Sequence, residues 1–145
     1  MADSCFLPTI ADAMDLVDAA TAVGGGAGAA ELPTLEIDAS RMPSIASNIQ
    51  AAQDSGLPSV LNREVDPAAI AANRSAACAG FCGTGSPDEY PFASTQQGGA
   101  GSRVAGVPLS EQYIQGGVIS QFYKRFAIGA GDPFRVIVTG LEGGR

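Results

Sequence analysis

The chain has 145 residues and a formal net charge of −7, a size that allows one domain with one modest hydrophobic core. No apolar run approaches the roughly 20 residues that cross a bilayer, which argues against membrane insertion. The sequence contains no His, so hydrolytic chemistry would have to rest on carboxylates and amides. The acidic pI argues at first sight against a nucleic-acid binder.

The charge is unevenly distributed along the chain. The first 38 residues contain no Lys or Arg, and their acidic residues are Asp3, Asp12, Asp15, Asp18, Glu31, Glu36 and Asp38. Beyond them, acidic and basic residues are equal in number. The acidic balance therefore belongs to the N-terminal quarter, and the objection to a nucleic-acid binder weakens for the remainder.

The first 30 residues read as a separate segment. Helical spacing of apolar residues predicts a helix over Pro8 to Val23, and Gly24 to Ala30 is typical of a flexible linker. We interpret this helix as a docking or connecting element, because its acidic polar face would be repelled by anionic lipid. The start of the chain lacks the basic residues of a signal peptide, so we expect any export address to lie elsewhere.

The next elements alternate between strands and helices. Short strands are predicted at 34–38 and at Ser59 to Asn62, and a helix opening at Pro43 presents Ile45, Ile49 and Ala52 on one face. Asp66 and Pro67 favour the start of a second helix that runs to about Ala77. Cys78 and Cys82 would form a small disulfide loop or remain two thiols, and without His they do not indicate a zinc site.

The second half of the chain predicts a hairpin followed by a helix. Strands over Glu89 to Thr95 and Arg103 to Val107 are joined by a Gly-rich turn, and a helix follows Gly116-Gly117. A last strand runs from Phe134 to Thr139. The fold class is α+β with a small mixed sheet, and the predicted domains are 1–30, a body at 31–140, and a frayed tail at 141–145.

Polar residues gather at the ends of this predicted ββα unit. Asp88 and Glu89 adjoin at a strand entry and should point to opposite faces, one towards a cleft and the other towards solvent or a metal. Taken alone, such a pair more often caps a loop. Glu111, Gln112 and Gln115 would usually be surface residues before a helix, so each signal is weak in isolation.

Their joint order resembles the NucA/NucB family of secreted bacterial deoxyribonucleases. The resemblance runs from Arg41-Met42-Pro43 through Ser55-Gly56-Leu57-Pro58 and is strongest at Asp88-Glu89-Tyr90-Pro91-Phe92-Ala93. It continues through Gln97-Gly98-Gly99, Glu111-Gln112 and Gln115-Gly116-Gly117, and ends at Gly131-Asp132-Pro133-Phe134. It covers about two-thirds of the chain, and the Asp-Glu-aromatic-Pro motif is its most specific part.

The resemblance implies a ββα-metal, His-Me-finger-like nuclease core in which an aspartate replaces the usual catalytic histidine. Asp88 matches the family's proposed general base, and we expect it to keep an ordinary pKa near 4. Gln112 stands where the family carries an Asn near its divalent metal, so an amide oxygen would ligate Mg²⁺ or Mn²⁺, with Glu111 or Gln115 sharing this work. We also expect Glu89 in the catalytic set.

Three basic residues complete the expected site. Arg103, on the second strand, is predicted to bind a phosphate oxygen with its guanidinium fork, although a plain surface residue is an equal alternative. Lys124 and Arg125 at the helix end would hold flanking phosphates or simply complement the helix dipole. The expected substrate is DNA, hydrolysed without sequence specificity.

A looser resemblance concerns the context of the domain. The run Gly80 to Pro87 and the Gly/Ala linker look like those of C-terminal toxin tips of Rhs-type polymorphic toxins, often delivered by type VI secretion. This implies an interbacterial toxin, delivered to the target-cell cytoplasm as part of a larger effector and paired with an immunity protein. The alternatives are a secreted scavenging or biofilm nuclease and a non-catalytic binding module on the same frame.

Overall fold

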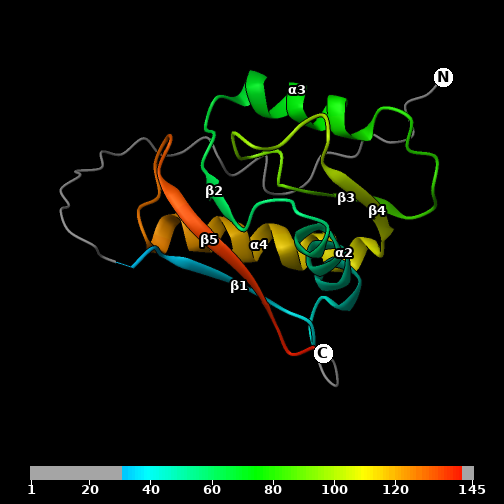
Figure 1. The fold of residues 1–145 in the computed structure, drawn as a ribbon, viewed down its shortest axis with the longest axis horizontal. Coiled ribbons are helices and arrows are strands. Elements are labelled where there is room, and N and C mark those ends of the chain that lie inside the picture. Colours follow the sequence, from blue (N-terminus) through cyan, green and yellow to red (C-terminus); the bar gives the residue numbers. More distant parts are fainter. Residues whose placement is uncertain (1–30, 142–145) are drawn as a thin grey trace.

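A computed structural model describes residues 31–141 of the protein. The predicted helix at Pro8 to Val23, the linker and the last residues of the tail lie outside this range. The described chain contains two small sheets and three helices, in agreement with the predicted α+β class (Figure 1). No helix among these residues is long and apolar enough to cross a membrane.

The first sheet is mixed and has three strands. Its central strand β5 (Pro133–Thr139) pairs in parallel with β1 (Thr34–Asp38) and antiparallel with β2 (Val60–Asn62). Phe134 and Val136 of β5 are buried, while Arg135 between them is exposed. The alternation of apolar and polar residues expected from the sequence therefore identifies the face of β5 that packs against the core.

Helices α2 (Pro43–Asp54) and α3 (Pro67–Cys78) follow the local signals in the sequence. Pro43 occupies the first turn of α2, and Ile45, Ile49 and Ala52 are fully buried on one face. The Asp66 carboxylate caps α3 by accepting a 3.1 Å hydrogen bond from the Ala68 amide. Both predicted helices are confirmed.

The second sheet is a hairpin of β3 (Ser86–Tyr90) and β4 (Arg103–Val107), in which Asp88 is opposite Ala105. The prediction that the first strand runs from Glu89 to Thr95 is wrong at both ends. Pro91 has no N–H to donate to the ladder, and a turn follows in which the Thr95 amide donates to the Phe92 carbonyl. The Tyr90–Pro91 peptide bond is cis.

Helix α4 (Leu109–Arg125) follows the hairpin directly, which completes a β3-β4-α4 unit. The prediction that Gly116-Gly117 precedes the helix is wrong, because both glycines lie in its middle. Two helical glycines cost roughly 1 kcal/mol each relative to alanine. The helix tolerates them because it buries Ile119, Phe122 and Tyr123 in the core.

The core lies between the mixed sheet and the helices α2 and α4, with the hairpin packed against α2, α3 and α4 (Figure 1). Its largest fully buried side chains include Tyr90, Phe134, Leu35, Ile37, Met42, Ile45 and Ile49. Every residue of β3 is buried, since helices cover the hairpin from more than one side. Asp88 and Glu89, which lie on β3, are therefore in the interior of the protein.

Candidate active site

Asp88 is the centre of the site. Its side chain is 2% exposed, and two amides from different helices donate hydrogen bonds to it. Asn48 Nδ2 on α2 lies 3.0 Å from Asp88 Oδ2, and Gln115 Nε2 on α4 lies 3.1 Å from Asp88 Oδ1. The carboxylate is thus held at both oxygens, which leaves each oxygen further capacity to accept a proton.

The burial of Asp88 changes its acid–base behaviour. Removal from water raises its pKa from 3.8 to about 7, against the lowering effect of the hydrogen bonds from Asn48 and Gln115. The negative charge of Glu111 raises the pKa further. The expectation of an ordinary pKa near 4 for Asp88 is therefore wrong, because the sequence did not reveal that both faces of its strand are covered.

Glu89 is also buried, at 7% exposure. Its Oε2 lies 3.8 Å from Arg74 Nε on α3. Both carboxylates are buried and both line one cleft, so the expectation that the second would face solvent is wrong, and its alternative, a metal, stays a prediction. Arg74 compensates the charge that the strand brings inside.

A small cleft opens between α3, β3 and α4, with room of about 30 Å³. Its lining brings together the side chains that the sequence singled out around the motif, namely Asp88, Glu89, Gln112 and Gln115, with Arg74, Pro87, Phe92, Ala93, Ser94 and Ile119. A polar cavity of this size accommodates water. The structure thus joins four of the eight expected site residues in one place.

The three residues at the start of α4 perform different tasks. Gln112 and Gln115 use their amide nitrogens as donors, to the Pro87 carbonyl at 2.6 Å and to Asp88, so the oxygen of each amide is the atom suited to ligate a cation. Glu111 does not line the cleft. Its Oε1 accepts hydrogen bonds from the backbone amides of Ser44 and Ile45 at the start of α2.

The donor set of the cleft suits a hard divalent cation. Amide and carboxylate oxygens are the ligands that Mg²⁺ and Mn²⁺ prefer, and Mg²⁺ often takes only one or two carboxylates and retains waters. No group of three or more His, Cys, Asp or Glu residues able to hold a metal occurs within residues 31–141. Gln112, Gln115 and Glu89 fit a cation of this kind. No cysteine of the described part of the chain lines the cleft, and Cys78 and Cys82 are not joined by a disulfide.

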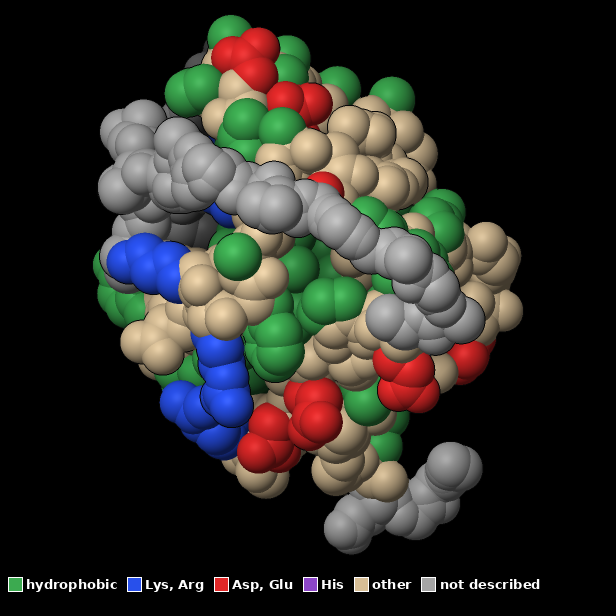
Figure 2. Space-filling view, turned by 90° about the vertical axis from the view of Figure 1, so that its left-hand side faces the viewer, with side chains coloured by type: hydrophobic (Ala, Val, Ile, Leu, Met, Phe, Trp, Pro, Cys, Tyr) green, Lys and Arg blue, Asp and Glu red, His purple; other side chains and the backbone are tan. Residues whose placement is uncertain are grey.

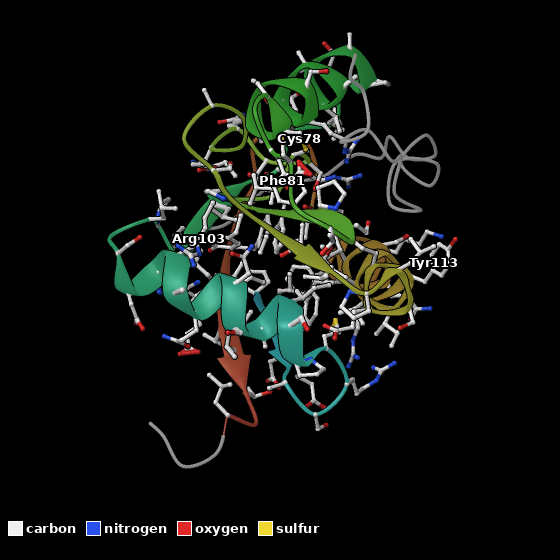
Figure 3. All side chains as sticks on the ribbon, turned by 90° about the vertical axis from the view of Figure 1, so that its right-hand side faces the viewer. Cys78, Phe81, Arg103 and Tyr113 are labelled. Carbon is white, nitrogen blue, oxygen red and sulfur yellow. The ribbon has the colours of Figure 1, made fainter. Side chains whose placement is uncertain are left out.

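The predicted basic residues lie outside the cleft. Arg103 is exposed at the start of β4 on the side of α2, where its Nε donates a 3.0 Å hydrogen bond to Asn48 Oδ1 (Figure 3). Lys124 and Arg125 are exposed in the last turn of α4, about 18 Å along the helix from Gln112. Figure 2 shows the face at that end of the molecule, where Lys and Arg side chains gather along one border.

Two site residues were missed by the sequence analysis, Asn48 and Arg74. Both are polar residues at positions where the helical spacing calls for an apolar one: Asn48 shares the buried face of Ile45 and Ile49, and Arg74 falls between Ile70 and Cys78. A polar residue within an apolar helix face is a signal for a buried partner. That signal was present in the sequence and points to both residues.

Comparison with known proteins places the chain in a family. The family model of the deoxyribonuclease NucA/NucB matches residues 49–137, a range that contains α3, the hairpin, α4 and the cleft-lining carboxylates and amides. No curated protein matches the chain. Since the family match spans more than half of the sequence, the chain belongs to the NucA/NucB deoxyribonuclease family, which implies DNA as the substrate.

Proposed function

We propose that this protein is a metal-dependent endonuclease that hydrolyses DNA without sequence specificity, with Asp88 as the general base. In this proposal β3, β4 and α4 form a ββα-metal core in which Asp88 takes the place of the usual histidine. The observation that carries the proposal is the buried Asp88 carboxylate at the cleft, held by Asn48 and Gln115, with its pKa raised to about 7.

A general base works best when its pKa lies near the operating pH. At neutral pH, a carboxyl group with a pKa of about 7 is ionised in a substantial fraction of molecules. It is also a much stronger proton acceptor than an exposed aspartate. Asp88 would take the proton of a water in the cleft, and that water would attack the scissile phosphate. The bond between phosphorus and the 3′ oxygen would break, and the leaving oxygen would take up a proton from solvent. No histidine is needed for this step, and the chain has none.

Gln112, Gln115 and Glu89 would hold the divalent cation, because all three line the cleft and offer oxygen ligands. A bound Mg²⁺ or Mn²⁺ supplies neutralisation of the charge that develops on the phosphate in the transition state. Glu111 is not included in this set, because it lies outside the cleft lining and one of its oxygens bonds the start of α2, so its role as a ligand stays a prediction. Lys124 and Arg125 would contact flanking phosphates, which carry no sequence information.

Plasmid nicking tests this proposal directly. Supercoiled DNA should be converted to nicked and linear forms with Mg²⁺ or Mn²⁺, cleavage should stop with EDTA, and excess metal should restore it. Plasmids of unrelated sequence should be cut at similar rates. Cleavage that persists in EDTA would remove the metal from the proposal, and binding of DNA without any cleavage would favour the binding-module alternative.

Gln112 should be the position most sensitive to ligand chemistry. Gln112→Ala removes an amide oxygen and should raise the Mn²⁺ concentration needed for half-maximal cleavage, by roughly 10–100-fold as for loss of a supporting group at a metal. Gln112→Asn keeps the oxygen and should retain part of the activity. Gln112 also bonds the Pro87 carbonyl, so thermal unfolding should be measured on both variants. An unchanged metal dependence in folded Gln112→Ala would place the ligands elsewhere.

Residues 1–30 should be dispensable for cleavage. They lie outside the described residues and outside the family match, and they carry four acidic and no basic residues. A chain beginning at Glu31 should cut DNA at least as fast as the full chain at low salt, because repulsion from phosphate is reduced. A full-length control with Asn at positions 3, 12, 15 and 18 separates charge from length. Failure of the shortened chain to fold would contradict the predicted domain boundary.

We further propose that the nuclease acts as the toxin domain of a larger effector, delivered to the cytoplasm of a target cell and restrained by an immunity protein. The support is the resemblance of Gly80 to Pro87 and of the linker to toxin tips, together with the hazard that an unspecific nuclease poses to its producer. An acidic inhibitor that covers the cleft would compete with DNA and weaken with salt. The test is expression of this chain in the cytoplasm of a bacterium, first alone and then with the adjacent gene, which should encode the immunity protein. Normal growth of cells that express an active enzyme alone would favour a scavenging nuclease.

A further inference from the structure

Asn48 connects the general base to Arg103. Its side chain is buried in α2 at 4% exposure, and its Nδ2 lies 3.0 Å from Asp88 Oδ2 and 3.2 Å from the Asp88 carbonyl. The same nitrogen lies 3.3 Å from the Arg103 carbonyl, while Asn48 Oδ1 accepts the 3.0 Å hydrogen bond from Arg103 Nε. Every polar atom of this buried amide therefore has a partner, and none of these bonds is local in sequence.

The contacts fix the direction in which the amide of Asn48 faces. A guanidinium group has only N–H donors, so Arg103 Nε must face the oxygen of Asn48 and not its nitrogen. The opposite side offers the Asp88 carboxylate and two carbonyl oxygens, which accept but do not donate. An amide turned by 180° would place donor against donor and oxygen against carboxylate. Arg103 thus opposes the reversed orientation of Asn48.

We propose that Arg103 and Asn48 are a positioning pair, in which Arg103 orients Asn48 and Asn48 holds the Asp88 carboxylate in its reactive orientation. Arg103 then acts through Asn48 and not on a substrate phosphate. The inference rests on the proposed role of Asp88 as general base. It assigns a task to Asn48, which lies one residue before the range that the family model matches, and replaces the predicted phosphate contact of Arg103.

The location of the two residues supports this assignment. Arg103 is not among the residues that line the cleft, and Figure 3 shows it beside α2, away from the start of α4 where Tyr113 projects. Asn48 and Gln115 hold opposite oxygens of Asp88 from different helices, so loss of Asn48 leaves one oxygen without its donor. Displacement of a reacting group by about 1 Å costs on the order of 100-fold in rate.

A double-mutant cycle measures the coupling between the two residues. Asn48→Leu, Arg103→Met and the double variant are compared with the wild type for kcat and KM on one duplex substrate, with thermal unfolding of each protein. Asn48→Leu should lower kcat by about 10–100-fold, as expected for loss of a hydrogen bond to a charged group. Arg103→Met should lower kcat by about 3–10-fold, a smaller loss, because Asn48 keeps its bond to Asp88 and loses only the contact that orients it.

The decisive result is the double variant. Arg103→Met should cause no further loss of kcat when Asn48 is already Leu, because the residue through which Arg103 acts is gone. KM should stay within about twofold of wild type throughout, since neither residue touches substrate. Arg135→Met is the matched control: it removes another exposed arginine, on the first sheet, and should leave both constants unchanged.

A phosphate contact would give a different pattern. Arg103→Met would then raise KM and reduce the slope of log KM against log salt by about one, the value for loss of one phosphate contact. Its effect on kcat/KM would also add in full to that of Asn48→Leu. That pattern overturns the positioning pair, and it is readable from Arg103→Met alone if Asn48→Leu does not fold. Asp88→Asn is assayed beside the cycle. If it cuts normally, the proposed base and the pair both fail. If it is inactive while Asn48→Leu and Arg103→Met cut normally, only the pair fails.

Discussion

Asp88→Asn should lower the rate of DNA cleavage by roughly 10²–10⁴-fold while the protein remains folded, as expected for loss of a general base. The substitution keeps the size of the side chain but removes its ability to take a proton. Gln115 can turn its amide and offer its oxygen to the new Asn, so the buried site keeps its hydrogen bonds. The measurement is single-turnover cleavage at saturating enzyme and Mg²⁺, which excludes product release from the observed rate.

Asp54→Asn is the matched control for this experiment. Asp54 is an exposed residue at the end of α2, and its Oδ1 accepts a hydrogen bond from Gln50 of the same helix. Its change should leave cleavage intact. Circular dichroism and thermal unfolding show whether each variant is folded. Wild-type cleavage by a folded Asp88→Asn protein would remove Asp88 from the mechanism, whatever the behaviour of the other variants.

The second large effect concerns stability in the metal-free protein. The pKa of Asp88 is about 7 in the folded state and near 3.8 when exposed, so the folded state binds this proton more tightly than the unfolded state. The stabilisation of the folded state by the proton on Asp88 is fully present below pH 3.8 and is lost as the pH rises towards 7. A difference of this size corresponds to about 4 kcal/mol of unfolding free energy lost between pH 4 and pH 8.

Urea unfolding in EDTA, at several pH values between 4 and 8, measures this loss. Asp88→Asn has no proton to lose, so its unfolding free energy should fall less with pH and should exceed that of the wild type at pH 8. The difference between the two proteins isolates Asp88, because the other titrating groups are common to both. Parallel curves for the two proteins would show that Asp88 ionises at its ordinary pKa. The proposed base would then have to be reconsidered.

Local signals were sufficient to predict most elements of the body. Pro43 and the Asp66-Pro67 pair mark the helix starts, and alternation marks the strands of the mixed sheet. Prediction failed where tertiary packing overrides local preference. Gly116-Gly117 reads as a turn, yet packing of α4 in the core holds both glycines inside the helix. Helix-breaking residues are tolerated there because burial outweighs their intrinsic preference.

The candidate site was predictable in its composition but not in its electrostatics. The resemblance located Asp88, Gln112 and Gln115, which the fold brings to one cleft. The raised pKa of Asp88 was not predictable, because it depends on helices distant in sequence that cover both faces of β3. Asn48 and Arg74 could be identified as buried polar residues, because each interrupts an apolar helix face, but the sequence did not show which carboxylate each one contacts.

The bond from Glu111 to the start of α2 has a consequence for how the helices are held together. The first amides of a helix have no partner within that helix, and the residue before α2, Met42, offers no side-chain cap. Glu111 Oε1 accepts hydrogen bonds from the amides of Ser44 and Ile45, so a carboxylate of α4 caps α2 from a distant part of the sequence. The helix that carries Asn48 is thereby tied to the helix that carries Gln112 and Gln115.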